Sequence, residues 1–268
     1  MKLGTLLRVP QINDEYLSFL HGIGLNCCQI ASLYDDILTD RPRSDAMVDC
    51  MKRNGLPPVS AFLSFPNQIW SGPDKDVGIT PPKNRAFRMT LSCREMLWCK
   101  RYGINDIVCH IGDLPETEDN YAQFVRDFQY LVKFAAENGQ RFLLETGMEK
   151  VEDIEKLFAD VACDNLGLNL DPANLLIYNA DVPQRYIERL SDKILGVHCK
   201  DAIPPADGET RGHETPLGAG ATDFAGIFHA LTAKGYNAPF IIERELQPGP
   251  EQQADITKAA KWLLSGCN

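Results

Sequence analysis

Four stretches of the chain decide its fold: RFLLETG (141–147), LGLNLDP (166–172), ILGVHCKD (194–201) and FIIERE (240–245). Each begins as a short apolar run typical of a buried parallel strand and then reaches a polar side chain. Those side chains are Glu145, Asp171, His198 and Glu243. Charged groups are costly to bury unless something compensates them. Three carboxylates and one imidazole at equivalent strand ends are a ligand set for a divalent metal.

The rest of the sequence repeats the same unit of an apolar run followed by a segment with apolar residues at helical spacing. The predicted strands are Lys2–Leu7, Gly24–Ala31, Pro58–Phe65, Asn105–Ile111, Arg141–Thr146, Asn165–Leu170, Ile194–Lys200 and Phe240–Glu245. The predicted helices are Asp14–Leu20, Asp45–Lys52, Arg85–Arg101, Tyr121–Glu137, Val151–Ala159, Pro183–Leu190, Asp223–Ala233 and Gln252–Leu264.

Strand–helix alternation favours parallel pairing with right-handed crossovers, and eight such units fit an α/β fold of the (β/α)8 TIM barrel type. No linker or shift in composition divides the chain, so we expect one domain over residues 1–268. The Pro- and Gly-rich stretches 65–82 and 203–220 should be long loops at the active-site end of the barrel. A G-x-G within 216–220 is interpreted as a tight turn. A doubly wound open sheet is the alternative fold, but no dinucleotide-binding or P-loop fingerprint accompanies it.

Composition and charge narrow the functional classes. The chain is 44% hydrophobic and has no uninterrupted apolar run of about 18 residues, so we expect no membrane span. The N-terminal apolar run is too brief for a secretory signal. With 37 acidic and 27 basic residues the formal charge is −10, which disfavours nucleic acid as a partner. Nine cysteines, without a C-x-x-C pair, indicate free thiols and a cytoplasmic location.

Side chains alternate along a strand, so the four polar groups can all point into the barrel and meet at its mouth. Cys199 has the opposite parity to His198 and should face the helices. A single strand-end carboxylate could instead cap a helix or form a salt bridge, and a lone histidine could be structural. Together the four predict one divalent ion. Their mostly oxygen donors favour Mn²⁺, with Mg²⁺, Co²⁺ and Zn²⁺ as alternatives.

These stretches also give the chain a family resemblance. LLETG, GLNLDPANLL, GVHCKD, TPLGAGATDF and IIERE resemble, in order and in metal-residue spacings of 26, 27 and 45, the xylose isomerase-like TIM barrels. The resemblance is to the sugar phosphate isomerase/epimerase family, which includes ketose 3-epimerases, inosose isomerases and dehydratases, and endonuclease IV. It implies that Glu145, Asp171, His198 and Glu243 bind one divalent metal. It also implies that Glu145 and Glu243 are acid/base catalysts.

Some positions depart from the patterns of that family. Asn174 stands where the ketose epimerases have a substrate-contacting His, and Pro204 where they have an Arg. Arg211, later in the same loop, could supply that charge. The endonuclease pattern needs further ligands for a three-zinc cluster. His110 and His213 match two of these, but Asn174 replaces another His and Arg211 stands where an Asp is expected, so a three-zinc site is not expected.

The predicted activity is that of an isomerase or epimerase moving a proton next to the carbonyl of a sugar or cyclic polyol ketone, through an enediolate. A dehydratase of the same family, an endonuclease IV-like nuclease and a non-catalytic sugar-binding barrel are the alternatives. We expect His110, Asn174, Lys200 and Arg211 to contact substrate. His110 could instead be structural, and Lys200 could instead pair with Asp201. The expected partner is a small-molecule sugar or polyol, and homo-oligomers are common in the resembling family.

Overall fold

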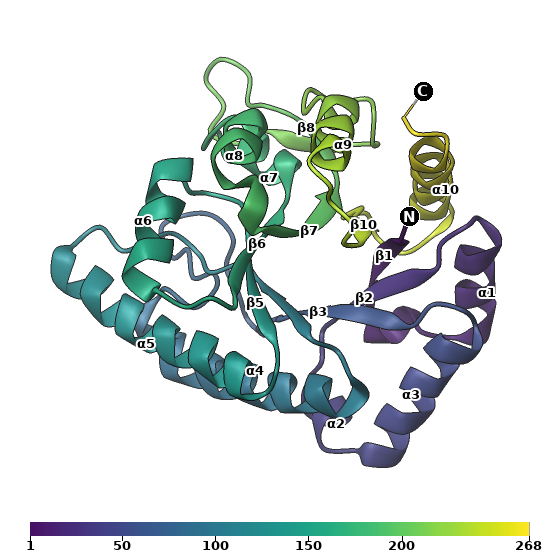
Figure 1. Cartoon of the computed structure of the whole chain (residues 1–268), viewed down its shortest axis with the longest axis horizontal. Helices are drawn as coiled ribbons and strands as arrows, with labels where there is room; N and C mark the ends of the chain where they lie inside the picture. Colours follow the sequence, from purple (N-terminus) through teal and green to yellow (C-terminus); the bar gives the residue numbers. More distant parts are fainter. Residues whose placement is uncertain (268) are drawn as a thin grey trace.

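The chain forms a closed barrel of eight parallel strands surrounded by helices (Figure 1). The computed structural model describes residues 1–267. Around the barrel the strands follow the order β1-β10-β7-β6-β5-β4-β3-β2. Their bounds are β1 Leu3–Arg8, β2 Cys27–Ala31, β3 Pro58–Phe62, β4 Asp106–Cys109, β5 Arg141–Glu145, β6 Leu166–Leu170, β7 Ile194–Cys199 and β10 Phe240–Ile242. The predicted TIM barrel is confirmed.

Helices form the outer layer, and all eight predicted helices are present. The helices are α1 Asp14–Gly22, α2 Asp35–Leu38, α3 Arg41–Arg53, α4 Pro82–Tyr102, α5 Glu118–Glu137, α6 Val151–Val161, α7 Pro172–Ile177, α8 Pro183–Leu190, α9 Phe224–Ala233 and α10 Pro250–Leu264. Four of them, α3, α4, α5 and α10, begin earlier than their apolar pattern. A capping side chain starts α3 and α5, whereas α4 and α10 start at a proline. Asp40, for example, accepts a hydrogen bond from the backbone N–H of Arg43 at the start of α3.

Three short elements were not predicted: α2, α7, and an antiparallel hairpin of β8 (Asp201–Ile203) and β9 (His213–Thr215). Their lengths of three to six residues are too short for a hydrophobic period to appear. Several barrel strands also end before the predicted bounds. Glu243, for instance, follows β10 instead of lying inside it.

The hydrophobic core lies mainly between the strands and the helices. Phe142 of β5 meets Phe128 of α5 edge-on, with ring centroids 5.3 Å apart. Cys199 belongs to this layer, as its parity predicted. The interior of the barrel differs, because buried polar side chains such as Gln29 and Asn169 point into it. Polar groups in such a place need partners, and several of these partners lie in the candidate site.

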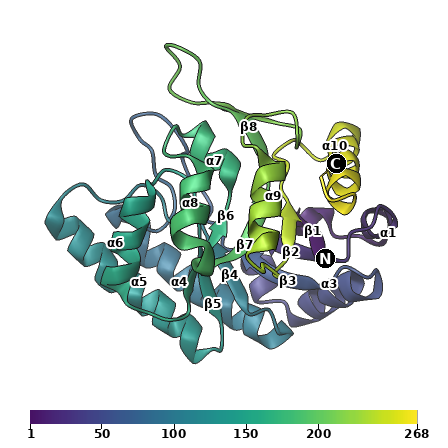
Figure 2. The ribbon, with the colours of Figure 1, turned by 45° about the horizontal axis from the view of Figure 1, so that its top comes forward.

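The β8–β9 hairpin rises above the mouth of the barrel (Figure 2). Its first residue, Asp201, is buried and accepts hydrogen bonds from the backbone N–H groups of Gly218, Gly220 and Thr222. The predicted turn at the G-x-G segment is therefore present, and the carboxylate of Asp201 holds it. The N–H groups of the turn already have an anionic partner. No helix within residues 1–267 is long and apolar enough to cross a membrane.

Candidate metal centre

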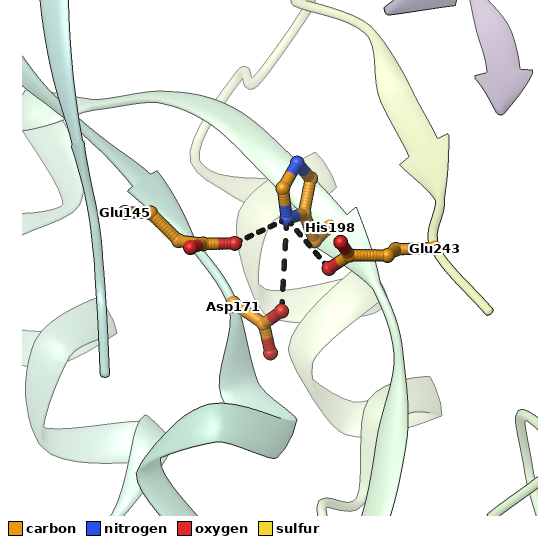
Figure 3. Close-up of side chains that lie close together, drawn as sticks. All are labelled: Glu145, Asp171, His198 and Glu243. Carbon is orange, nitrogen blue, oxygen red and sulfur yellow. Dashed lines mark ion pairs between the residues drawn. The ribbon is translucent and has the colours of Figure 1, made fainter. Parts of the chain in front are cut away.

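The structure brings the four predicted side chains together in one buried cluster (Figure 3). One ligand atom from each of Glu145, Asp171, His198 and Glu243 lies within 4.8 Å of the others. Nδ1 of His198 is the centre of the group. It lies 2.8 Å from Oε1 of Glu145, 3.1 Å from Oε2 of Glu243 and 3.6 Å from Oδ2 of Asp171.

The start of α7 orients Asp171. This residue is the N-cap of α7, and its Oδ1 accepts a hydrogen bond of 2.9 Å from the backbone N–H of Asn174. Thr146, which directly follows β5, exchanges hydrogen bonds with the backbone N–H and C=O of Asp171. The second carboxylate oxygen, Oδ2, has no hydrogen-bond partner among the described residues. One oxygen is thus held by the fold while the other faces the cluster.

A hydrogen-bonded chain across the barrel orients His198. The side-chain amide of Gln29 donates to the hydroxyl of Ser60 over 3.0 Å, so the oxygen of that amide faces His198. This oxygen lies 2.8 Å from Nε2 of His198 and can only accept, which places a proton on Nε2. The lone pair of a neutral imidazole then lies on Nδ1, among the carboxylates. Such a partner on the distal nitrogen is the usual support of a metal-binding histidine.

The charges of the cluster are strongly coupled. Burial raises the pKa of Glu145 to about 7, with His198 opposing and Glu243 and Asp171 adding to the rise. Burial alone would raise the pKa of Glu243 too, but Lys200 and His198 hold it well below its usual value. Burial would lower the pKa of His198, but the three carboxylates raise it well above the ordinary range. Without a metal ion, a proton on Nδ1 of His198 would hold the three carboxylates together.

Lys200 is a buried cation beside the cluster. Its Nζ lies 2.7 Å from Oε1 of Glu245, 3.2 Å from Oε2 of Glu243 and 3.6 Å from Oδ2 of Asp171. It also donates to the side-chain oxygen of Asn174. These glutamates outweigh burial and raise the pKa of Lys200 well above its usual value. The alternative that Lys200 pairs with Asp201 is wrong, because the carboxylate of Asp201 holds the G-x-G turn instead.

These residues fit a divalent cation. Asp171 Oδ2 and His198 Nδ1 are buried without a hydrogen bond among residues 1–267, and both face the carboxylates. Buried polar atoms of this kind call for an ion or other partner. A mostly oxygen donor set with one imidazole suits a hard or borderline divalent metal. The group could therefore bind one metal ion, with Glu145, Asp171, His198 and Glu243 as ligands.

Sequence comparison gives the family. The profile of the xylose isomerase-like TIM barrel matches residues 17–265. The chain belongs to this family.

Relatives within the xylose isomerase-like family carry different activities in their names. The inosose dehydratase of Lacticaseibacillus casei is 26% identical over 169 residues, which cover 57% of this chain and 56% of that protein. The L-ribulose-5-phosphate 3-epimerase UlaE of Salmonella paratyphi A is 31% identical over 93 residues, 35% of this chain and 31% of that protein. The chain therefore spans about half the length, or less, of these curated relatives.

A solved structure resembles the whole chain. The xylose isomerase domain protein of Planctomyces limnophilus superposes with a TM-score of 0.91 at 26% identity, covering 98% of this chain and 96% of that one. The predicted resemblance to xylose isomerase-like barrels is confirmed.

A pocket of about 550 Å³ opens above the cluster. Three of the predicted substrate residues line it: His110, Asn174 and Arg211. The guanidinium of Arg211 lies 4.9 Å from the ring centroid of Tyr178 and donates a hydrogen bond to its hydroxyl. Lys200 is not part of the pocket lining and lies beneath it, next to Asn174 and Glu243.

His110 is a buried neutral donor. Its Nδ1 accepts a hydrogen bond of 3.1 Å from the backbone N–H of Gly112, so Nε2 carries the proton. Nε2 has no hydrogen-bond partner among the described residues. Burial lowers the pKa of His110 to about 4. A side chain at Gly147 would place its Cβ 2.5 Å from Nε2, so only glycine leaves room for this ring.

Sequence reasoning missed the residues that support the cluster. Gln29, its partner Ser60, and the aromatic Tyr178 on the pocket wall were not predicted. One signal was present: a glutamine inside the apolar run NCCQIA implies a buried polar partner. Its partner His198 lies 169 positions along the chain, a distance at which sequence spacing gives no register.

Proposed function

We propose that this chain is a divalent-metal-dependent isomerase or epimerase. Its substrate is a sugar or cyclic polyol ketone, and the reaction transfers a proton at the carbon next to the carbonyl. The observation that carries the proposal is the placement of two carboxylates, Glu145 and Glu243, on different sides of one cluster below an open pocket (Figure 3). A bound divalent cation, with Mn²⁺ as the first candidate, would polarise the carbonyl.

The two glutamates have different electrostatic surroundings. Glu243 is held ionised by Lys200, which suits a proton acceptor, whereas burial raises the pKa of Glu145 to about 7. A carboxyl group with a pKa near the working pH can both give and take a proton. In the proposed reaction one glutamate removes the proton next to the carbonyl. The other returns a proton to the opposite face or to the neighbouring carbon, giving epimerisation or isomerisation.

The pocket residues would position the substrate. Nε2 of His110 offers an unused donor to a substrate oxygen. Asn174 and Arg211 also line the pocket, Asn174 next to Lys200 and Arg211 against Tyr178. Lys200 contributes from below by holding Glu243 and Asn174 in place.

A dehydratase is the second candidate. The match to an inosose dehydratase extends over 169 residues, against 93 for the epimerase relative. The same first step, removal of a proton next to a carbonyl, would be followed by loss of a β-hydroxyl as water. The two outcomes differ in product mass.

The test is hydrogen exchange in D2O with the Mn²⁺-loaded protein and a panel of ketoses and inososes. We expect one substrate to gain deuterium next to its carbonyl, and chelation of the metal to stop this exchange. Glu145→Gln and Glu243→Gln should each lower the exchange rate by about 10²–10⁴-fold. Glu137→Gln is the matched control, because Glu137 is exposed at the end of α5 and away from the pocket lining, and it should retain the rate. No exchange with any ketone of the panel would contradict the proposal.

A further inference from the structure

The pocket above the metal centre is divided by charge. Its acidic lining residues, Glu145, Glu243 and Glu245, belong to β5 and to the segment that follows β10. The other half of the mouth lies at the ends of β1 to β4, and in the described chain it contributes no carboxylate to the lining. Among the described residues that line this half of the pocket, Arg8 is the one positively charged side chain, since His110 is neutral.

Arg8 is directed into the pocket by the pleat of β1. It is the last residue of this strand and shares its parity with Leu6, which also lines the pocket. Its register partner on β2 is Ala31, another lining residue. The backbone of Arg8 is therefore held in a barrel strand and not in a loop.

The guanidinium of Arg8 has no ion pair with a carboxylate among residues 1–267. Most arginines of this acidic chain do have one: Arg85 pairs with Asp127, and Arg244 with Glu214. Charged groups facing a pocket without a partner are candidates for ligand contacts.

The surroundings of Arg8 are polar and locally strained. Ser32 directly follows Ala31 and has a φ of 63°, a left-handed conformation that few non-glycine residues adopt. Its backbone N–H donates to the hydroxyl of Ser64, and both serines line the pocket. This half of the mouth thus offers hydroxyl groups next to an unpaired cation.

We propose that Arg8 binds an acidic oxygen group, a carboxylate or a phosphate, at the end of the substrate remote from the reacting carbon. Four carboxylates, Glu145, Asp171, Glu243 and Glu245, surround the metal centre. A divalent cation and Lys200 would together offset three of their charges, and Arg211, which also lines the pocket, would offset the fourth. No carboxylate of the pocket is then left to balance Arg8, so its counter-charge comes from the ligand. This inference rests on the proposed function, because the proposed function defines which end of the substrate reacts. An arginine recognises either oxyanion through two parallel hydrogen bonds.

The test is binding of three polyols that differ only at one end: D-glucitol, D-gluconate and D-glucitol 6-phosphate. None of them has a carbonyl to be turned over, so isothermal titration measures binding alone. Titration of both metal-free and Mn²⁺-loaded protein separates Arg8 from direct binding of the carboxylate to the ion. We expect one or both acidic polyols to bind at least about 10-fold more tightly than D-glucitol in both forms. The acidic polyol that binds more tightly shows whether Arg8 recognises a carboxylate or a phosphate.

Arg8→Ala should remove this preference, and Arg8→Lys should keep part of it. Arg126→Ala is the matched control, because Arg126 is exposed on α5 and, within residues 1–267, bonds only Gln123. Equal binding of the three polyols, or a preference that survives Arg8→Ala, would overturn the inference. Deuterium exchange with neutral ketoses at the same kcat/KM as with their acidic counterparts would also overturn it, while leaving the proposed function standing. An Arg8-dependent preference without any exchange would support the inference and contradict the function.

Discussion

The two halves of the barrel mouth are built differently. On the half formed by β5, β6, β7 and β10, the cluster side chains are almost fully buried, with Asp171 and His198 at 0% exposure and Glu145 at 5%. On the half formed by β1 to β4, Tyr34 and Trp70 remain 38% and 39% exposed. Buried and mutually bonded groups keep one geometry, whereas exposed side chains can adapt to a ligand. The difference teaches that the reacting groups are confined to the buried half, whereas residues that position the substrate come from both halves, as His110 and Arg211 do.

The largest effect expected on the buried half is that of Lys200→Met. This change leaves Glu243 and Glu245 without their cation, and breaking a buried ion pair costs about 3–5 kcal/mol. Urea unfolding of the metal-free protein measures the loss. Lys156→Met is the control, because Lys156 is exposed and pairs with Asp160 on α6, where about 0.5 kcal/mol is expected. Equal losses for the two variants would show that burial does not set the cost of losing an ion pair in this chain.

His110 provides a pH-dependent test at the end of β4. Its pKa is lowered by burial to about 4, so between pH 6.5 and 4 the unfolded chain binds a proton that the folded chain rejects. The stability from the neutral imidazole is present above pH 6.5 and is lost as pH falls through this window, by roughly 3 kcal/mol at most. The free energy of unfolding of His110→Asn should lose this slope. The exposed His229→Asn should keep it, and identical profiles for the wild type and His110→Asn would contradict the buried neutral state.

Gln29 crosses the division, because it lies on β2 and supports His198 on β7. Gln29→Leu removes the acceptor for the Nε2 proton and should weaken Mn²⁺ binding about 10–100-fold. Gln29→Glu restores an acceptor and should recover most of the affinity, which isothermal titration measures for both variants. In nitrogen NMR spectra of the metal-free protein, Gln29→Leu should shift the tautomer signals of His198. Unchanged affinity and signals would mean that the half at β1–β4 is not needed for the metal centre.

The same division explains what the sequence could predict. Glu145 and His198 were found because each ends an apolar strand, and the two-residue alternation within a strand fixes the direction of its side chains. Asn174, in the first turn of α7 after β6, followed from the family resemblance. Gln29 and Arg8 were missed because their significance depends on neighbours across the barrel.

The loops show the same limit. The stretch 203–220 was correctly predicted as a long loop, but its β8–β9 hairpin was not. Asp201, the first residue of the hairpin, accepts hydrogen bonds from backbone N–H groups 17 to 21 positions later, in the segment that follows β9. Such a tertiary contact leaves no period in the sequence. The proline and glycine content of residues 203–220 indicated only that regular structure ends there.

The most direct test of the account is the number of divalent ions bound per chain. Metal-free protein is titrated with Mn²⁺, dialysed and measured by elemental analysis, alongside Asp171→Asn. Asparagine also caps helices, so this variant keeps the start of α7 while losing the ligand charge. We predict one tightly bound ion per wild-type chain and none in the variant. No retained ion in the wild type, or equal retention in the variant, would contradict the metal centre.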